Sequence, residues 1–149
     1  MFHVTKNVLV IRPMNSGDLP RVEAIYRALH PRPMPARDWS RYHVIVTARA
    51  DTVAGYAAAQ LLLDNTFLLT ETLVLPEFQG RGIGRRLMEA RLRLGQQLGA
   101  TEALGGCDDD HTAMVHLLLS QGFRPVERED AQTFLGRPNA RLYSRSLKG

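Results

Sequence analysis

The sequence has one cysteine and one tryptophan in 149 residues, and it lacks a long apolar segment. Cys107 alone cannot form a disulfide within the chain, and no CxxC or Cys/His cluster suggests a zinc site. The longest mostly apolar run, residues 53–63, is shorter than the roughly 20 residues that a membrane-spanning helix needs. Residues 1–13 also lack the apolar stretch of a signal peptide. We therefore expect a soluble cytoplasmic protein without a metal.

Lysine is nearly absent, so arginine carries almost all of the positive charge. Lys6 and Lys148 are the only lysines, and the formal net charge is +4. This mild basicity suits an anionic small molecule as well as nucleic acid, and alone it does not distinguish them. Hydrophobic residues make up 44% of the chain and charged residues 23%, an ordinary globular mixture. At this length we expect one domain, residues 1–149, with a two- or three-layer core.

Apolar periodicity divides the chain into strands and helices that alternate. Strands are expected at residues 8–11, 43–50, 53–63, 65–75, 101–106, 123–129 and 140–147. Helices are expected at residues 15–30, 83–98 and 111–122, and residues 37–43 leave room for one short turn. Asn15 followed by Asp18 is a variant of the capping box at the first helix. Because several strands meet through short turns, the pattern predicts a mixed α/β sheet.

The most informative segment is "LVLPEFQGRGIGRRLMEA", residues 73–90, in which Gly80, Gly82 and Gly84 separate an apolar strand from a helix. The start of a helix presents free backbone N–H groups and the positive end of the peptide dipoles. Glycines let a phosphate approach such an end closely. Three arginines, Arg81, Arg85 and Arg86, add positive charge nearby. The segment therefore predicts a phosphate-binding turn, with an unliganded glycine-rich corner as the alternative.

Two familiar phosphate motifs do not fit this turn. A Walker P-loop needs Lys and then Ser or Thr after its last glycine, where this sequence has Arg85 and Arg86. A Rossmann fingerprint needs GxGxxG with an acidic residue about twenty positions later, where Leu104 and its neighbours are small or apolar.

The run Gln79–Gly84 does fit the pattern Q/R-x-x-G-x-G/A. Val74, Pro76 and Phe78 precede it as a hydrophobic-x-Pro-x-aromatic lead-in, and an amphipathic helix follows. This combination resembles the acetyl-CoA-binding motif of the GNAT superfamily of N-acetyltransferases, and the resemblance extends over most of the chain. It implies a GNAT fold: a mixed, mostly antiparallel sheet of about six or seven strands, splayed at the motif strand, with about four helices.

The resemblance also implies a cofactor, acetyl-CoA, and the residues that bind it. Main-chain groups of Leu73, Val74 and Leu75 would pair with the pantetheine arm, and N–H groups of the turn would bind the pyrophosphate. Arg85 could reach an outer phosphate, and His111 could contact the pantetheine. The expected cofactor-binding residues are Leu73, Val74, Leu75, Gln79, Gly80, Arg81, Gly82, Ile83, Gly84, Arg85 and His111.

The implied reaction is direct transfer of an acetyl group from the thioester to a primary amine, which needs a base. Glu71, a carboxylate within the apolar motif strand, is the candidate base, and a solvent-facing or salt-bridged glutamate is the alternative interpretation. His43 and the His111/Asp110 pair are weaker candidates. The backbone N–H near Val74 is the expected oxyanion contact.

The family's usual general acid is missing. Aligned with its N-x-x-A-x-x-L-Y pattern, this chain has His111, Met114, Leu117 and Leu118, of which only Leu117 matches. Leu118 therefore stands at the tyrosine position. CoA could leave as a thiolate, water or another residue (Cys107, Tyr143 or His111) could protonate it, or the protein could bind CoA with little turnover.

The acceptor is the least determined part of the prediction. The family places it near residues 27–43, 61–66 and 128–143, and carboxylates that could steer a cationic amine are Asp108, Asp109, Asp110, Glu127, Glu129 and Asp130. The expected partner is a small-molecule or peptide amine, without nucleic acid or membrane, and homodimer formation stays open. The alternative function is a CoA- or acyl-CoA-binding sensor or non-catalytic partner protein with the same fold. Nucleic-acid binding through residues 81–93 is disfavoured because no aromatic stacking platform accompanies the arginines.

Overall fold

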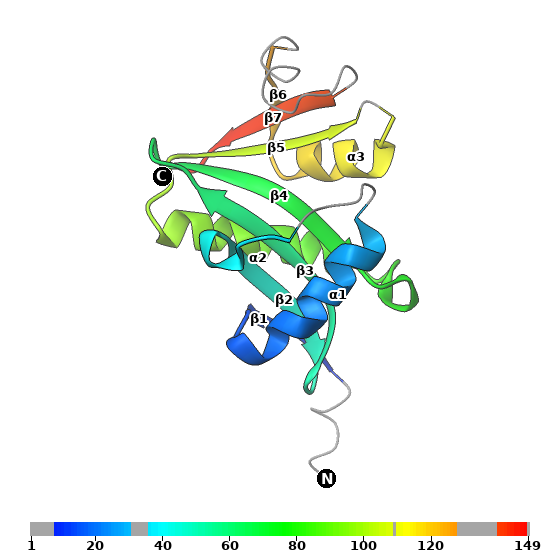
Figure 1. Cartoon of the computed structure of the whole chain (residues 1–149). Helices are drawn as coiled ribbons and strands as arrows, with labels where there is room; N and C mark the ends of the chain where they lie inside the picture. The colour runs from blue at the N-terminus through cyan, green and yellow to red at the C-terminus, as the bar shows by residue number, and fades with distance from the viewer. Residues whose placement is uncertain (1–7, 31–35, 109, 128–139, 149) are drawn as a thin grey trace. The chain divides into compact units, whose positions relative to one another are not determined.

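The computed structural model describes residues 8–30, 36–108, 110–127 and 140–148. Within these ranges, seven strands form one sheet in the order β1-β2-β3-β4-β5-β7-β6 (Figure 1). β4 and β5 pair in parallel, whereas β1–β2, β2–β3, β5–β7 and β6–β7 pair antiparallel. The mixed, mostly antiparallel sheet predicted from the sequence is therefore confirmed.

Most secondary-structure elements follow the predicted segments, but the strand expected at residues 123–129 is shorter: only Arg124–Pro125 form a strand, residues 126–127 do not, and residues 128–129 lie outside the described ranges. The strands are β1 Leu9–Pro13, β2 His43–Arg49, β3 Thr52–Leu61, β4 Thr66–Val74, β5 Glu102–Asp108, β6 Arg124–Pro125 and β7 Ala140–Ser146. The α-helices are α1 Leu19–Leu29, α2 Ile83–Gln97 and α3 Thr112–Ser120, and the 3-10 turns are η2 Ser16–Asp18, η3 Trp39–Arg41 and η4 Pro76–Phe78. Within the described ranges there are thus three α-helices where about four were expected. The segment 37–43 holds a single 3-10 turn.

β4 pairs with β5 over only part of its length. The parallel register joins Thr66–Leu68 to Glu102–Leu104 and ends there. β5 continues to Asp108 in antiparallel register with β7.

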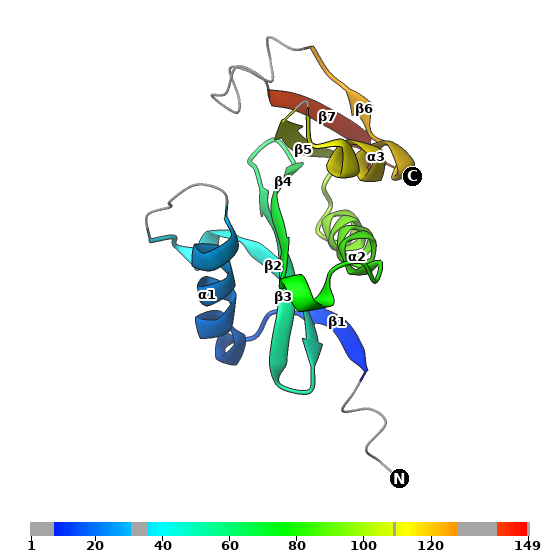
Figure 2. The same ribbon diagram turned by 90° about the vertical axis from the view of Figure 1, so that its right-hand side faces the viewer.

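The chain forms two compact units, residues 1–59 with 71–91 and residues 60–70 with 92–149. In the first unit, α1 lies on one face of β2 and β3, and the first half of α2 lies on the opposite face (Figure 2). Val22 and Ile25 of α1 pack in one core cluster with Val46 and Tyr56 of these strands. Their burial stabilises α1 on the sheet, because each fully buried side chain of this size contributes about 1.5–3 kcal/mol.

The capping box predicted from Asn15 and Asp18 is present, and it closes the 3-10 turn η2, whose last residue, Asp18, stands at the N-cap position of α1. Asn15 Oδ1 accepts the Asp18 N–H at 3.1 Å, and Asp18 Oδ2 accepts the Asn15 N–H at 2.9 Å. Arg12 of β1 donates to both oxygens of Asp18, at 2.6 and 3.0 Å. The hydrogen bond from Arg12 is the main cause that lowers the pKa of the buried Asp18 carboxyl. The box therefore links β1 to the turn η2 that leads into α1.

In the second unit, α3 lies beside β5 (Figure 1). A Cβ added at Gly105 of β5 would come within 3.2 Å of Leu118 Cδ2 on α3. Glycine at this position therefore lets the helix approach the strand closely. Leu118 is 1% exposed, so it belongs to the core of this unit.

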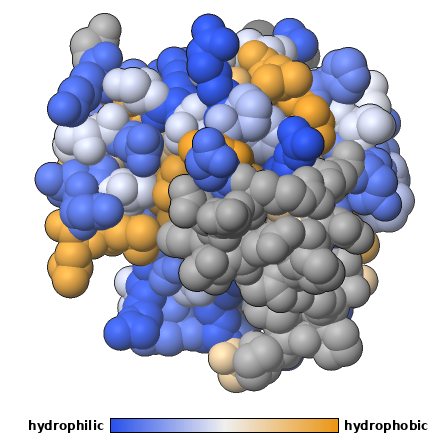
Figure 3. All heavy atoms as spheres, turned by 90° about the horizontal axis from the view of Figure 1, so that it is seen from above, coloured by the Kyte–Doolittle hydropathy of each residue, from blue (hydrophilic) through white to orange (hydrophobic). Residues whose placement is uncertain are grey.

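Figure 3 shows one face of the molecule, on which hydrophilic side chains cover most of the described surface and apolar ones lie in separate groups. Among described residues, the exposed large apolar side chains are Val8, Val10, Leu63, Leu98 and Leu119. Scattered exposed apolar residues are ordinary in folded proteins and identify no interface. None of the described helices has the length and apolar content that a membrane span requires.

Candidate active site

The end of β4 and the segment Gln79–Gly84, which we call the glycine turn, lie in the first unit. Leu75 N–H donates to Ala54 O of β3 at 2.9 Å, and Leu75 O accepts the Phe78 N–H at 2.9 Å. Because main-chain groups alternate in direction along a strand, those of Val74 point away from β3. Val74 O accepts a hydrogen bond from Gln79 Nε2 at 2.9 Å. The Val74 N–H is thus the main-chain donor at this strand end that faces away from β3.

The turn between η4 and α2 has the backbone that its glycines allow. Gly80 and Gly82 have φ values of 80° and 74°, a region that other residues rarely adopt. A Cβ at Gly80, Gly82 or Gly84 would meet no atom within 4 Å, so the space beside the turn is open. At the start of α2, Arg86 N–H donates to Gly82 O at 3.2 Å. Within the described part of the chain, the N–H groups of residues 80–85 have no acceptor. The turn therefore presents free donors at the positive end of the helix.

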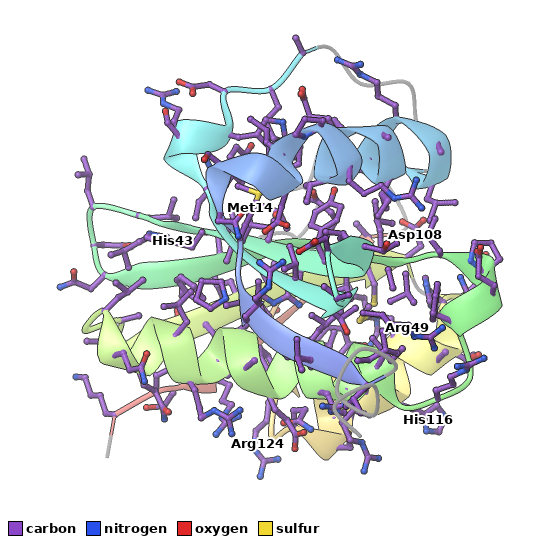
Figure 4. All side chains as sticks on the ribbon, turned by 90° about the horizontal axis from the view of Figure 1, so that it is seen from below. Met14, His43, Arg49, Asp108, His116 and Arg124 are labelled. Atoms are coloured by element: carbon purple, nitrogen blue, oxygen red, sulfur yellow. The ribbon has the colours of Figure 1, made fainter. Side chains whose placement is uncertain are left out.

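Two arginines flank Phe78 next to this turn. The guanidinium carbon of Arg49 lies 5.3 Å from the Phe78 ring centroid, and that of Arg81 lies 5.7 Å from it. Arg49 ends β2 and is labelled in Figure 4. Its Nε is buried and finds no acceptor among the described residues. Sequence reasoning missed Arg49, because only the pairing of β2 with β3 brings it to the turn. Arg85 and Arg86 are exposed on α2.

Glu71, the candidate base, is a buried carboxylate with two donors on one oxygen. Its Oε2 accepts from Arg37 Nη1 at 2.6 Å and from the Tyr56 hydroxyl at 2.6 Å. Its Oε1 is buried and has no hydrogen-bond partner among the residues that the structure describes. The salt-bridged interpretation of Glu71 thus describes its state in the free protein, and its role as a base stays a prediction.

Arg37 reaches Glu71 through a group of aromatic rings. Its guanidinium carbon lies 4.1 Å from the ring centroid of Tyr42, 4.4 Å from that of Tyr26 and 4.9 Å from that of Trp39. Burial lowers the pKa of Arg37, but the hydrogen bond and charge of Glu71 outweigh burial and leave this pKa raised. Arg37 therefore stays charged.

Tyr56 completes the surroundings of Glu71. Burial, followed by the charge and the hydrogen bond of Glu71, raises the pKa of Tyr56 above its ordinary value. Tyr56 therefore remains protonated and continues to donate to Glu71 throughout the physiological range.

A second arginine holds the main chain at Glu71. Arg91 of α2 is 2% exposed, and its Nη1 donates to Ala58 O at 2.8 Å and to Glu71 O at 3.1 Å. Burial lowers the pKa of Arg91 to about 10. Sequence reasoning missed this residue because an arginine on an amphipathic helix is usually solvated. Arg91 joins α2 to β3 and β4 at the position of the buried carboxylate.

The remaining candidates belong to other parts of the structure. His111 is exposed at the start of α3, where its Nδ1 accepts the Met114 N–H at 3.2 Å and caps the helix. Leu118 is a core residue, and Cys107 and Tyr143 are buried in β5 and β7. His43 begins β2 (Figure 4). Of the candidate acceptor region, Asp109, Glu129, Asp130 and residues 31–35 and 128–139 lie outside the described residues.

Comparison with known proteins identifies the family. The sequence profile described as "Acetyltransferase (GNAT) family" matches residues 16–123. The chain belongs to this family. Among curated proteins, none matches the sequence at a significant level.

Solved structures agree with the GNAT assignment at the level of fold. The ribosomal-protein-S18-alanine N-acetyltransferase of Escherichia coli has a TM-score of 0.79 and 22% identity, over 95% of this chain and 96% of that chain. The Salmonella typhimurium protein yncA, solved with its cofactor acetyl-CoA, has a TM-score of 0.74 and 21% identity, over 96% of each chain. A Bacillus subtilis acetyltransferase in complex with CoA has a TM-score of 0.78 and 15% identity, over 95% of this chain and 100% of that chain. The predicted GNAT fold is confirmed.

Proposed function

We propose that this GNAT protein is an acetyl-CoA-dependent N-acetyltransferase that acts on a primary amine of a small molecule or peptide. The observation that carries the proposal is the glycine turn. Two positive-φ glycines, open space beside them and free N–H groups at residues 80–85 stand together at the start of α2. Such a helix end binds phosphate groups without a dedicated side chain. Two of the similar structures, those of yncA and the Bacillus subtilis enzyme, contain acetyl-CoA or CoA.

In this proposal the turn binds the pyrophosphate of acetyl-CoA. The N–H groups of Gly80, Arg81, Gly82, Ile83 and Gly84 supply the hydrogen bonds, and Arg81 and Arg85 supply charge. Arg49, whose buried Nε has no acceptor among the described residues, is an additional candidate for a phosphate contact. The pantetheine arm follows the end of β4, where the Val74 N–H faces away from β3. Gln79 fixes this strand end by donating to Val74 O.

The chemical step combines one proton transfer, the formation of one bond and the cleavage of another. The acceptor amine gives up a proton, its nitrogen forms a bond to the thioester carbonyl carbon, and the C–S bond then breaks with its electron pair on sulfur. The Val74 N–H would stabilise the oxyanion of the intermediate. Glu71 is the predicted proton acceptor, directly or through water, and only its Oε1 lacks a donor among the described residues. Leu118 has no proton to give, so CoA would leave as a thiolate or take a proton from water.

One observation favours the second candidate function, a CoA-binding sensor or partner protein. Leu118 is 1% exposed and packs beside Gly105. It stands at the position where the family frequently places the tyrosine that acts as general acid. A side chain in this environment has no catalytic use. A protein that needs only to bind CoA would tolerate it without loss.

Two measurements on the purified protein test both functions. Calorimetry with acetyl-CoA should show binding, and absence of binding would overturn the cofactor assignment. Release of CoA thiol is then followed with a panel of amines that includes amino acids, diamines and peptides with free N-termini. Turnover with any of them establishes the transferase, whereas tight binding without turnover across the panel favours the sensor.

A further inference from the structure

The aromatic rings around Arg37 form a site for a cation. We call Tyr26, Trp39, Tyr42 and Glu71 the cation box. Its three rings lie 4.1–4.9 Å from the Arg37 guanidinium carbon, within the distance at which the face of a ring attracts a cation. Glu71 supplies the negative charge, 2.6 Å from Arg37 Nη1. All of these residues belong to the first unit.

The walls of the box are held by contacts that do not involve Arg37. Trp39 packs edge-to-face on Tyr26, with centroids 5.4 Å apart, and on Tyr56, with centroids 5.8 Å apart. The ring centroid of Tyr42 lies 6.0 Å from that of Trp39. Tyr26, Trp39 and Tyr56 are buried in the core cluster of α1, β2 and β3, and Tyr42 packs against that cluster. The rings therefore remain in place when another cation occupies the position of Arg37.

The carboxylate in the box has acceptor capacity that Arg37 does not use. An ionised carboxylate accepts hydrogen bonds at both oxygens. Arg37 and Tyr56 both donate to Oε2, and no described residue donates to the buried Oε1. A buried acceptor without a donor is unfavourable, so Oε1 favours a ligand that brings a further N–H donor.

Arg37 enters the box from a segment without regular structure. Ala36 and Asp38, its neighbours in sequence, are both exposed, and the next element, η3, begins at Trp39. The main chain at Arg37 is therefore not held in a strand or helix. The side chain of Arg37, in contrast, lies in the interior and is only 9% exposed.

We propose that the cation box is the acceptor-binding subsite and that Arg37 occupies it in the free protein as a stand-in for a cationic group of the acceptor. This inference rests on the proposed acetyltransferase function. An incoming cation would replace Arg37, and Arg37 would return to solvent. The exchange keeps Glu71 paired, whereas a neutral or anionic group would leave a buried carboxylate without a counter-charge, which is strongly unfavourable.

The cation in the box is a second charge of the acceptor and not the amine that reacts. Ring faces and a carboxylate both stabilise a positive charge, but the attacking nitrogen must be neutral. The acceptor class is therefore an amine with a guanidinium or a second ammonium at its other end, such as an aminoalkylguanidine or a diamine. In this arrangement Glu71 anchors the acceptor instead of acting as the proton acceptor considered above, and the attacking amine loses its proton to bulk solvent before or during attack.

Trp39 provides a direct measurement, because it is the only tryptophan in the chain. We suggest titrating 4-aminobutylguanidine into the protein without acetyl-CoA while Trp39 fluorescence is followed, with N-butylurea as a neutral probe. The cationic probe should change the emission and the urea should not. In Arg37→Met, which keeps an apolar side chain but removes the competing cation, binding should tighten by about ten-fold or more.

The outcomes separate the cation box from a purely structural ion pair. A folded Arg37→Met protein that shows no response to the cationic probe would overturn the proposal. If that variant does not fold, the wild-type protein decides: a response that Tyr42→Leu removes supports the box, and no response contradicts it. Because acetyl-CoA is absent from the titration, its failure would leave the calorimetric test of the proposed function unaffected.

Discussion

Arg37 and Glu71 are 34 residues apart in the sequence, yet Arg37 Nη1 lies 2.6 Å from Glu71 Oε2 in the interior of the first unit. The pair joins the segment after α1 to the strand that leads into the glycine turn. It places a charged carboxylate, which in isolation would be costly to bury, where Arg37 and Tyr56 both donate to it. Any function of Glu71, as a base or as a binding group, therefore depends on whether Arg37 stays paired with it.

Replacing Glu71 by glutamine should lower acceptor turnover without changing acetyl-CoA binding. The amide cannot accept a proton and cannot neutralise a cation, so we expect kcat/KM for the acceptor to fall by about 100-fold. Rates are measured by thiol release and acetyl-CoA affinity by calorimetry. A fall confined to kcat, with an altered pH profile, would assign Glu71 as the base, and a rise confined to KM would assign it to acceptor binding.

The control for this substitution addresses stability. Glu71→Gln leaves Arg37 without its counter-charge, so part of any loss of activity could come from unfolding. The double variant Arg37→Met/Glu71→Gln removes both charges and should recover thermal stability relative to Glu71→Gln. Wild-type kinetics in a folded Glu71→Gln protein would remove Glu71 from both roles.

Substitutions in the glycine turn should abolish acetyl-CoA binding. Gly84→Glu places a carboxylate in the open space beside the free N–H groups, and it does so at an ordinary φ. Gly82→Glu adds backbone strain, because Gly82 has a φ of 74°. We expect calorimetry to detect no binding for either variant, through repulsion between the new carboxylate and the pyrophosphate.

Gly99→Glu is a matched control at the other end of α2. Gly99 has a φ of 85° and open space beside it, so Gly99→Glu introduces backbone strain comparable to that of Gly82→Glu. It does so at the far end of the helix from the glycine turn. This variant should lose stability but keep its affinity for acetyl-CoA. Equal affinity in Gly84→Glu and the wild type would contradict the pyrophosphate assignment.

The features that the sequence could predict are those set by neighbouring residues. The capping box needs only Asn15 and Asp18, three positions apart, and the glycine turn needs only the spacing of its glycines and the helix that follows. Both signals are local, because the hydrogen bonds and φ values they require arise within a few residues. The same argument holds for the approximate bounds of the strands and helices.

The features that the sequence could not predict depend on pairing between distant segments. Arg37 and Arg49 come to the candidate site from outside the motif, and no spacing rule connects either of them to it. On α2, Leu87 and Met88 are buried as expected of apolar residues, but so is Arg91, whereas Leu98, the residue after the helix, is 38% exposed. The buried arginine has acceptors only because Ala58 O and Glu71 O face it, which periodicity cannot show.

Leu118→Tyr tests whether a missing acid limits catalysis, and the structure predicts that the test has a cost. Leu118 is fully buried and in close contact with β5, so the larger tyrosine should destabilise the protein by about 1–3 kcal/mol. We expect a lower melting temperature and no gain in turnover. Leu118→Phe is the control, because it adds the ring without the hydroxyl. Faster thiol release by Leu118→Tyr than by Leu118→Phe would instead show that protonation of the thiolate limits the rate.

The pH dependence of stability should report on the Asp18 capping box. The pKa of Asp18 is lowered in the folded protein, chiefly by the hydrogen bond from Arg12. A lowered folded pKa means that the stabilisation is present above the unfolded pKa, near 4, and is lost as pH falls through the folded pKa. Asp18→Asn should therefore reduce the free energy of unfolding at pH 7 by about 1 kcal/mol, the typical cost of losing a capping interaction. It should also flatten the acid limb of the stability curve below pH 4.

Two further variants serve as controls. Arg12→Met should flatten the same limb by removing the main cause of the lowered Asp18 pKa, and Glu89→Gln, an exposed change on α2, should leave the limb unchanged. Denaturant unfolding from pH 2 to 7 measures all four proteins, and an acid limb in Asp18→Asn as steep as in the wild type would show that Asp18 does not link stability to pH.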